Sequence, residues 1–168
     1  MTKNIVLIGL MGSGKTTIGK ILAEKTGMKL VDTDAQIVEK AGKSIKQIFA
    51  DNGEMFFRDL ESEVIERISI QENLVVSTGG GAVLRDENLE NLKQNSILFY
   101  LHAPAEILYK RIKDDKNRPL VNTPNPLETL KKIQENREYF YGQANYKIQT
   151  NNKSPEEIAD EIIRLFAA

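Results

Sequence analysis

The residues best suited to chemistry stand near the start of the chain, where residues 9–16 read GLMGSGKT. This segment fits the pattern G-x-x-x-x-G-K-[ST], in which glycines let consecutive backbone N–H groups surround a phosphate. A strand-like run, NIVLI (residues 4–8), leads into it, and an amphipathic helix is expected to begin at Lys15. The N-terminus of that helix would add roughly half a positive charge. The sequence therefore predicts a site for a nucleoside triphosphate.

Two side chains of this segment have expected roles of their own. Lys15 should reach the β- and γ-phosphates, and the hydroxyl of Thr16 should ligate Mg²⁺. The alternative is a glycine-rich turn that matches the pattern by chance. The predicted nucleotide-binding residues of the loop are Gly12, Ser13, Gly14, Lys15, Thr16 and Thr17.

Composition excludes several classes of function. The chain has 168 residues, with 23 Lys and Arg against 24 Asp and Glu, so its formal net charge of −1 gives no positive field for nucleic acid. It has no Cys, and His102 is its only His, which excludes disulfides and histidine metal clusters. Its apolar runs are far shorter than the roughly 20 residues that span a bilayer. We expect one domain over residues 1–168 that is soluble and cytoplasmic, with no membrane partner.

Short β-branched runs alternate with longer helical patterns, which predicts an α/β domain. Three of the runs are nearly continuous in apolar residues, as expected for a parallel sheet covered on both faces by helices. Ser154 and Pro155 are typical of an N-cap and first residue, here of a terminal helix. Binding sites in such domains lie at the carboxyl ends of the strands. The strand candidates are NIVLI (4–8), KLVDTD (29–34), LVVST (74–78), SILFYL (96–101) and YKIQT (146–150).

Two carboxylates, Asp32 and Asp34, end the second strand candidate. Because side chains alternate along a strand, both would lie on one face at the carboxyl edge of the sheet. There they could serve Mg²⁺ and a substrate hydroxyl, respectively. The alternative is a helix N-cap, since Thr33 or Asp34 before AQIVEK would be an ordinary capping residue.

The segment STGGGAVL, residues 77–84, places three successive glycines after a buried strand candidate. Glycine leaves backbone N–H groups bare, which suits the close approach of an oxygen-rich ligand. A flexible turn would have the same sequence, so the segment by itself leaves both interpretations open.

Three arginines could bind an anionic group, but composition does not rank them. Arg58 has Glu61 three residues on, which is also typical of a surface ion pair. Arg118 lies in the polar segment KDDKNRPLVNTPN, residues 113–125, which could be a lid or a plain solvated loop. Arg137 is expected on a helix.

Other classes of nucleotide-binding protein fit less well. A GTPase would need N-K-x-D to read guanine, and the nearest sequence, residues 152–155, is NKSP with Pro in place of Asp. A remodelling ATPase would need an acidic residue at the end of a Walker B strand, where LVVST has Ser77 and Thr78. A small phosphotransferase is the economical interpretation.

Taken together, six segments resemble the shikimate kinase family, whose members are nucleoside-monophosphate-kinase-like P-loop enzymes. The segments are GLMGSGKT, DTD, FFRDLE, STGGGA, RPL and REYFY, in the family's order and at its approximate spacings. The resemblance implies a five-stranded parallel sheet of order 2-3-1-4-5 with helices on both faces. It also implies a mobile lid at about residues 113–125, a substrate-binding helical region at about 33–62, and a monomer.

The resemblance assigns roles around the nucleotide residue by residue. Lys15 contacts the transferring phosphate, Thr16 binds Mg²⁺, and Asp32 supports the metal. Arg118 comes down with the lid onto the γ-phosphate. The positions that flank the adenine are Arg111 and Pro155.

The resemblance also assigns the residues that bind the acceptor. Asp34 hydrogen-bonds the substrate hydroxyls and is the candidate general base. Arg58 and Arg137 clamp the shikimate carboxylate. Gly80 and Gly81 offer backbone N–H groups to the ring substituents.

The implied reaction is the ATP-dependent phosphorylation of shikimate to shikimate 3-phosphate with release of ADP, in the pathway to chorismate and aromatic amino acids. Shikimate and ATP would be the partners, and Mg²⁺ the cofactor. The main alternative is another small kinase of the same superfamily, such as a gluconate or nucleoside monophosphate kinase. From a different class, a nucleotide-dependent binding module without an acceptor is an alternative that the DTD pair argues against.

Overall fold

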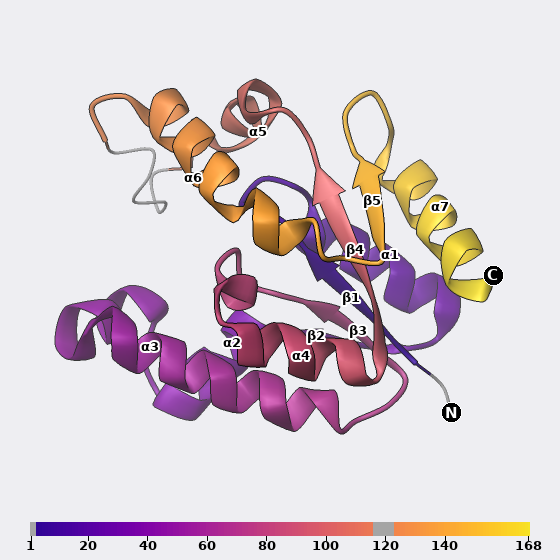
Figure 1. The fold of residues 1–168 in the computed structure, drawn as a ribbon, viewed down its shortest axis with the longest axis horizontal. Coiled ribbons are helices and arrows are strands. Elements are labelled where there is room, and N and C mark those ends of the chain that lie inside the picture. Colours follow the sequence, from indigo (N-terminus) through magenta and orange to yellow (C-terminus); the bar gives the residue numbers. More distant parts are fainter. Residues whose placement is uncertain (1–2, 116–122) are drawn as a thin grey trace.

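The five predicted strands form one sheet, with helices on both of its faces (Figure 1). The structure is a computed structural model that describes residues 3–115 and 123–168. Within these residues, the strands are β1 (Asn4–Ile8), β2 (Lys29–Asp32), β3 (Leu74–Ser77), β4 (Ser96–His102) and β5 (Tyr146–Gln149).

The strands pair in the order β2-β3-β1-β4-β5, and every neighbouring pair is parallel. This confirms the predicted sheet and its order. Ser77 at the end of β3 is in register with Leu7 of β1 on one side and with Asp32 of β2 on the other. The segments that follow these three strands therefore leave the sheet side by side, at the edge where parallel α/β domains bind ligands.

Each parallel connection crosses over the sheet through helical segments, as the alternating sequence pattern predicted. Among the described residues, no helix is long and apolar enough to cross a membrane. The helices are α1 (Lys15–Thr26), α2 (Thr33–Ala41), α3 (Ile45–Ser69), α4 (Asp86–Gln94), α5 (Ala105–Ile112), α6 (Pro126–Tyr141) and α7 (Pro155–Ala167), with the 3₁₀ helix η1 (Ala82–Leu84) before α4.

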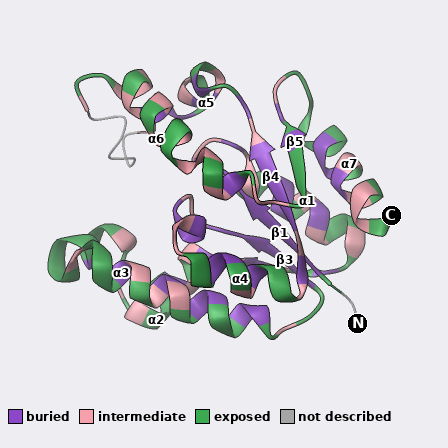
Figure 2. Cartoon of the chain, viewed as in Figure 1, coloured by how far each residue is buried: buried purple, intermediate pink, exposed green. Residues whose placement is uncertain are grey.

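The central strand β1 is buried on both faces, which explains its unbroken apolar sequence (Figure 2). Val6 and Ile8 belong to the core cluster that packs under α2 to α6. Ile5 and Leu7 belong to the opposite cluster, together with residues of α1 and α7. The alternation of a strand thus sends successive side chains into two separate cores, one on each face of the sheet.

The second strand is shorter than predicted. β2 ends at Asp32, and α2 begins at Thr33, so the predicted extension of this strand to Asp34 is wrong. The physical reason is a helix cap: the Asp32 carboxylate accepts a hydrogen bond from the N–H of Ala35 at 3.1 Å. The alternative prediction of a helix N-cap was therefore correct, but the capping residue is Asp32 and not Thr33 or Asp34.

Helix α3 consists of two helical stretches that meet at Gly53, whose φ of 85° and ψ of 171° lie outside the helical region. The predicted substrate-binding region, residues 33–62, falls on α2 and the larger part of α3. The predicted lid, residues 113–125, begins after α5 and ends before α6. Its residues 116–122, which include Arg118, lie outside the described residues, so the lid stays a prediction.

Candidate active site

Residues 9–14 form a tight loop between β1 and α1, and Lys15 and Thr16 are the first residues of the helix. Gly9 (φ 147°) and Gly12 (φ 80°) adopt backbone conformations that other residues rarely take. Neither position has room for a side chain: a Cβ on Gly9 would lie 2.6 Å from the carbonyl oxygen of Leu101, and one on Gly12 would lie 2.9 Å from Cγ2 of Ile112. Glycine is thus required by shape at Gly9, the first position of the predicted pattern, and at Gly12 within it, and the loop is packed against β4 and α5.

Lys15, the first residue of α1, lies along this loop. Its Nζ donates hydrogen bonds to the carbonyl oxygens of Gly9 at 2.5 Å and Leu10 at 3.0 Å. The residue before it, Gly14, provides no side-chain cap for the helix. The N-terminal N–H groups of α1 are therefore not capped by the side chain that usually satisfies them, and a positive charge lies next to them.

A cavity of about 410 Å³ opens in front of this loop at the carboxyl ends of β2 and β3. It brings together residues that are distant in sequence, including Asp115 after α5 and the start of the glycine-rich turn. The predicted site residues that line it are Gly12, Ser13, Gly14, Lys15, Thr16, Thr17, Asp32, Asp34, Gly80 and Arg111.

A second cavity, of about 310 Å³, lies next to the first. Part of the loop and Arg111 line both cavities. It is lined on its other side by Thr150, Lys153 and Pro155, between β5 and α7. Arg111 joins these elements, because its Nη1 donates to the carbonyl oxygen of Gly12 at 3.0 Å and to Oγ1 of Thr150 at 3.3 Å. The two residues predicted to flank adenine, Arg111 and Pro155, thus line one cavity beside the phosphate loop.

Asp34 projects from the first turn of α2 into the larger cavity. Its Oδ1 is buried and has no hydrogen-bond partner among the described residues. Burial and the charge of Asp32 raise the pKa of the Asp34 carboxyl, while Lys15 and Arg58 oppose the rise. A buried carboxylate oxygen without a donor is costly unless a ligand supplies one, so Asp34 is well placed to accept a hydrogen bond from a substrate hydroxyl.

The three predicted charged side chains of the acceptor site approach the glycine-rich turn, Gly79–Gly81. A Cβ on the first glycine would lie 2.7 Å from Oδ1 of Asp34, and one on the second would lie 3.1 Å from Nη1 of Arg137. On the third it would lie 2.5 Å from Nη2 of Arg58. The structure thus brings together the predicted acceptor residues, and glycine is what allows the carboxylate and the two guanidinium groups to approach the turn.

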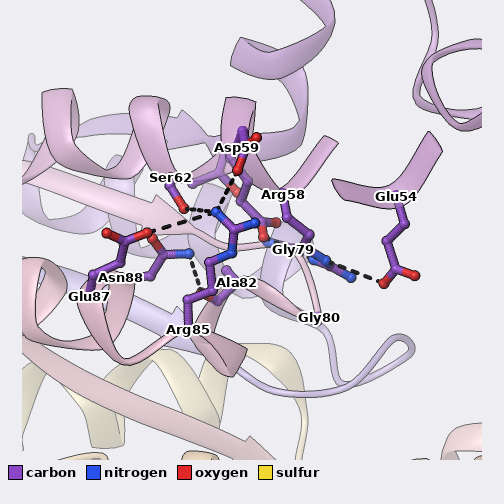
Figure 3. A network of polar contacts seen from close by, with 12 residues as sticks. Glu54, Arg58, Asp59, Ser62, Gly79, Gly80, Ala82, Arg85, Glu87 and Asn88 are labelled. Atoms are coloured by element: carbon purple, nitrogen blue, oxygen red, sulfur yellow. Dashed lines mark hydrogen bonds and ion pairs between the residues drawn. The ribbon is translucent and has the colours of Figure 1, made fainter. Parts of the chain in front are cut away.

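Arg58 forms an ion pair with Glu61 that is buried rather than exposed. Their Nη1 and Oε1 atoms lie 2.9 Å apart, and only 1% of the Glu61 side chain is exposed. The exposed carboxylate of Glu54 also lies 3.7 Å from Nε of Arg58 (Figure 3). The alternative of a surface ion pair is therefore wrong for the Arg58–Glu61 pair.

Glu61 was not predicted as a site residue, although it lies next to the turn. A Cβ on Gly79 would be 3.3 Å from its Oε2, which is buried and has no hydrogen-bond partner in the described residues. Burial raises the pKa of the Glu61 carboxyl, against the lowering effect of Arg58. The sequence held a signal for it, since Glu61 interrupts the buried face that Phe57 and Val64 define on α3.

The glycine-rich turn is also held from outside the cavity. The Thr33 hydroxyl accepts a hydrogen bond from the N–H of Gly79 at 3.0 Å. Asn88 of α4 donates to the carbonyl oxygen of Ala82 at 2.9 Å (Figure 3). These supports come from α2 and α4, on either side of the turn in the chain.

The donor set at the loop fits Mg²⁺. No group of three or more His, Asp or Glu side chains able to hold a metal occurs in residues 3–115 and 123–168. The Thr16 hydroxyl and the Asp32 carboxylate line the same cavity, and only Oδ1 of Asp32 is used by the helix cap. Mg²⁺ commonly takes one or two protein oxygens together with phosphates and water.

The fold and the geometry of the site define a class: a small-molecule kinase with a P-loop, in which the phosphate cradle faces a pocket for an anionic acceptor. Comparison with known proteins agrees. The sequence model described as shikimate kinase matches residues 11–167. The chain belongs to the shikimate kinase family, as its motifs predicted.

The similarity extends over nearly the whole chain. The chain is 46% identical to a shikimate kinase of Caldicellulosiruptor bescii, over 99% of this chain and 96% of that one. It is 44% identical to a shikimate kinase of Thermodesulfovibrio yellowstonii, over 96% of this chain and 94% of that one. The structure of a shikimate kinase from Acinetobacter baumannii in complex with shikimate matches with a TM-score of 0.94 and 39% identity, covering 99% of this chain and 94% of that one.

Proposed function

We propose that this chain transfers the γ-phosphoryl group of ATP to a ring hydroxyl of shikimate, giving shikimate 3-phosphate and ADP in the pathway to chorismate and aromatic amino acids. Membership of the shikimate kinase family supports the reaction. The observation that carries the assignment to this site is the convergence of Asp34, Arg58 and Arg137 on the glycine-rich turn, directly beside the phosphate loop.

The phosphate loop positions the donor. Its backbone N–H groups and the N-terminus of α1 bind the phosphates, and Lys15 leaves its carbonyl partners to contact the transferring group. Arg111 and Pro155 flank the adenine in the smaller cavity. Phosphoryl transfer depends mainly on alignment and charge neutralisation, so these contacts account for the donor side of catalysis.

Arg58 and Arg137 orient the acceptor by binding its carboxylate. Each charge-assisted hydrogen bond of this kind is worth about 1.5–3 kcal/mol. The planar guanidinium groups also fix orientation, so that one ring hydroxyl faces the phosphate. Gly80 and Gly81 add backbone N–H groups, which the glycine sequence leaves accessible.

Asp34 accepts a hydrogen bond from the reacting hydroxyl and takes up its proton as the oxygen–phosphorus bond forms. The raised pKa of its carboxyl suits this role, because a base is most effective when its pKa approaches the working pH. Its unpartnered Oδ1 is the atom available for that bond.

Thr16 and Asp32 would hold Mg²⁺ together with the phosphates of ATP. When bound there, the metal would neutralise charge on the phosphate oxygens. Arg118, in the proposed lid at residues 113–125, is proposed to contact the γ-phosphate. A loss of kcat in Arg118→Ala tests that role, and an unchanged kcat would contradict it.

We further propose that the protein is one kinase domain in the cytoplasm, as its length and composition suggest, and that it acts as a monomer, as the family resemblance implies. The hydrodynamic mass of the purified protein tests the monomer: a value near 18.9 kDa is expected, and a mass of twice that would contradict it.

The function is tested by coupled ADP release from MgATP with shikimate, gluconate, AMP or no acceptor. Only shikimate should accelerate the release. If gluconate or AMP works and shikimate does not, the phosphate loop assignment stands but the acceptor assignment is wrong. If no acceptor works although ATP binds, the chain is a nucleotide-dependent binding module instead.

A further inference from the structure

The last residue of α6, Tyr141, lies behind the glycine-rich turn and has no role in the mechanism described above. We propose that the hydroxyl of Tyr141 is a positioning group, which fixes the peptide between Gly80 and Gly81 so that the N–H of Gly81 stays available to the bound acceptor. This inference rests on the proposed function, because it concerns the same acceptor pocket.

The geometry starts from one hydrogen bond. The Tyr141 hydroxyl donates to the carbonyl oxygen of Gly80 at 2.5 Å. That carbonyl and the N–H of Gly81 belong to one planar trans peptide, so they point in opposite directions. The hydrogen bond that holds the Gly80 carbonyl toward Tyr141 therefore keeps the Gly81 N–H pointing away from Tyr141.

The turn needs such a restraint because its own bonds leave this peptide undetermined. The Gly79 carbonyl accepts from Ala82 and the Gly81 carbonyl accepts from Leu84, at 3.1 and 3.2 Å. In the described part of the chain, the N–H groups of Gly80 and Gly81 donate to no backbone carbonyl oxygen. Glycines tolerate many backbone conformations, so without the Tyr141 bond this peptide could rotate and withdraw its N–H.

The position of Tyr141 also links the turn to the anion-binding side chains. Tyr141 lies one helical turn after Arg137 on α6, so the two side chains share a face of the helix. A Cβ on Gly80 would lie 3.1 Å from Nη1 of Arg137. One helix thus places both the guanidinium group that is proposed to bind the carboxylate and the hydroxyl that orients the neighbouring peptide.

A purely structural role for Tyr141 is the competing explanation, since its side chain is 1% exposed. The chain offers a matched control in Tyr100, which is equally buried and whose ring stacks on that of Tyr141 with centroids 4.9 Å apart. The Tyr100 hydroxyl donates to Oε2 of Glu138 at 3.0 Å and makes no contact with the turn. Each tyrosine can therefore lose only its hydroxyl, within the same ring stack.

The test compares Tyr141→Phe with Tyr100→Phe by steady-state kinetics and thermal unfolding. Because a neutral hydrogen bond contributes modestly, Tyr141→Phe should raise the KM for shikimate by about 3- to 10-fold and change the KM for ATP by less than about twofold. Tyr100→Phe should change neither KM, although both variants lose a similar amount of thermal stability. Equal changes in both KM values, or KM values that match those of Tyr100→Phe, would overturn the inference.

A second measurement needs no variant. Addition of shikimate to the ¹⁵N-labelled wild-type protein should shift the amide proton of Gly81 downfield, as expected for a new hydrogen bond, and the absence of any shift would overturn the inference. The wild-type assay separates the two proposals. A wild type that does not phosphorylate shikimate contradicts the proposed function, whereas an active wild type with an unaffected Tyr141→Phe variant contradicts only the role of Tyr141.

Discussion

The phosphate loop and the acceptor pocket lie side by side but are built in opposite ways. The loop is a continuous stretch, residues 9–17, at the junction of one strand and one helix, and its proposed binding groups are chiefly backbone N–H groups. The pocket is assembled from α2, α3, the Gly79–Gly81 turn and α6, and its proposed binding groups are mostly charged side chains. The loop therefore binds with little buried side-chain charge, whereas the pocket holds the carboxylates of Asp34 and Glu61 in a desolvated site.

Because of this difference, substitutions in the two regions should have different effects on the two substrates. Changes in the loop should act on the donor and on turnover. Changes in the pocket should act on the acceptor, and some of them should also alter stability, because buried charges are costly when a partner is lost.

The largest effect is expected from Asp34→Asn. Loss of the base should lower kcat by about 10²- to 10⁴-fold, while ATP still binds to the loop. Steady-state kinetics and ATP titration measure both. Glu39→Gln, on the exposed side of the same helix, is the matched control and should behave as wild type. Near-normal turnover in Asp34→Asn would exclude a catalytic role for this carboxylate.

Lys15→Ala should lower kcat by about 10²- to 10³-fold, because a positive group that contacts the transferring phosphate is lost. Shikimate affinity, measured by titration without nucleotide, should not change. Lys20→Ala on the exposed face of α1 serves as the control. If Lys15→Ala weakens shikimate binding as well, the two regions are not separable.

Arg58→Ala should raise the KM for shikimate by roughly 10- to 100-fold and leave the KM for ATP nearly unchanged, because a charge-assisted bond to the carboxylate is lost. It should also lower the Tm, because Glu61 keeps a buried charge without its partner.

The double variant Arg58→Ala/Glu61→Gln separates these two effects. It should recover much of the Tm and none of the shikimate affinity. Equal shifts in the KM values of both substrates would make Arg58 a structural residue.

The pH dependence of stability should report the buried charge of Asp34. Its pKa is raised in the folded state, so the folded protein binds this proton more readily than the unfolded chain. The stabilisation from this proton is present below the ordinary carboxyl pKa and is lost as the pH rises through the raised value. Asp34→Asn cannot ionise, so its Tm should rise relative to that of the wild type as the pH increases from about 4 to neutrality. A Tm difference that is constant with pH would contradict this.

The smallest effect concerns the two roles of Asp32, as helix cap and as proposed metal support. Asparagine caps helices as well as aspartate does, so Asp32→Asn should keep its stability and need more Mg²⁺ for half-maximal activity. Asp32→Ala should need more Mg²⁺ and also lose about 1 kcal/mol, or about 2–4 °C in Tm. An unchanged Mg²⁺ requirement in both variants would leave Asp32 as a cap alone.

The sequence by itself determined the fold class, the five strands and the phosphate loop. These features depend on local rules: apolar runs at strand length, helical periodicity, and glycines at fixed spacing before a lysine. The order of the strands came instead from the resemblance of the motifs to a family, because no local rule states which strands pair. The predicted end of β2 was wrong for a local reason. Asp32 and Asp34 fit both the alternating pattern of a strand and the start of a capped helix, and the sequence alone does not choose between the two.

Tertiary structure alone decided the character of the acceptor pocket. The spacing of Arg58 and Glu61 is the same for a surface pair and a buried one. Only the packing of α3 against α2, α4 and η1 leaves the Glu61 side chain 1% exposed. The support of Gly80 by Tyr141 joins residues 61 positions apart, which no local pattern could connect. A site made of backbone groups, such as the phosphate loop, can be recognised from a short stretch of sequence. The burial and pairing of charged side chains depend on which distant elements the fold brings together.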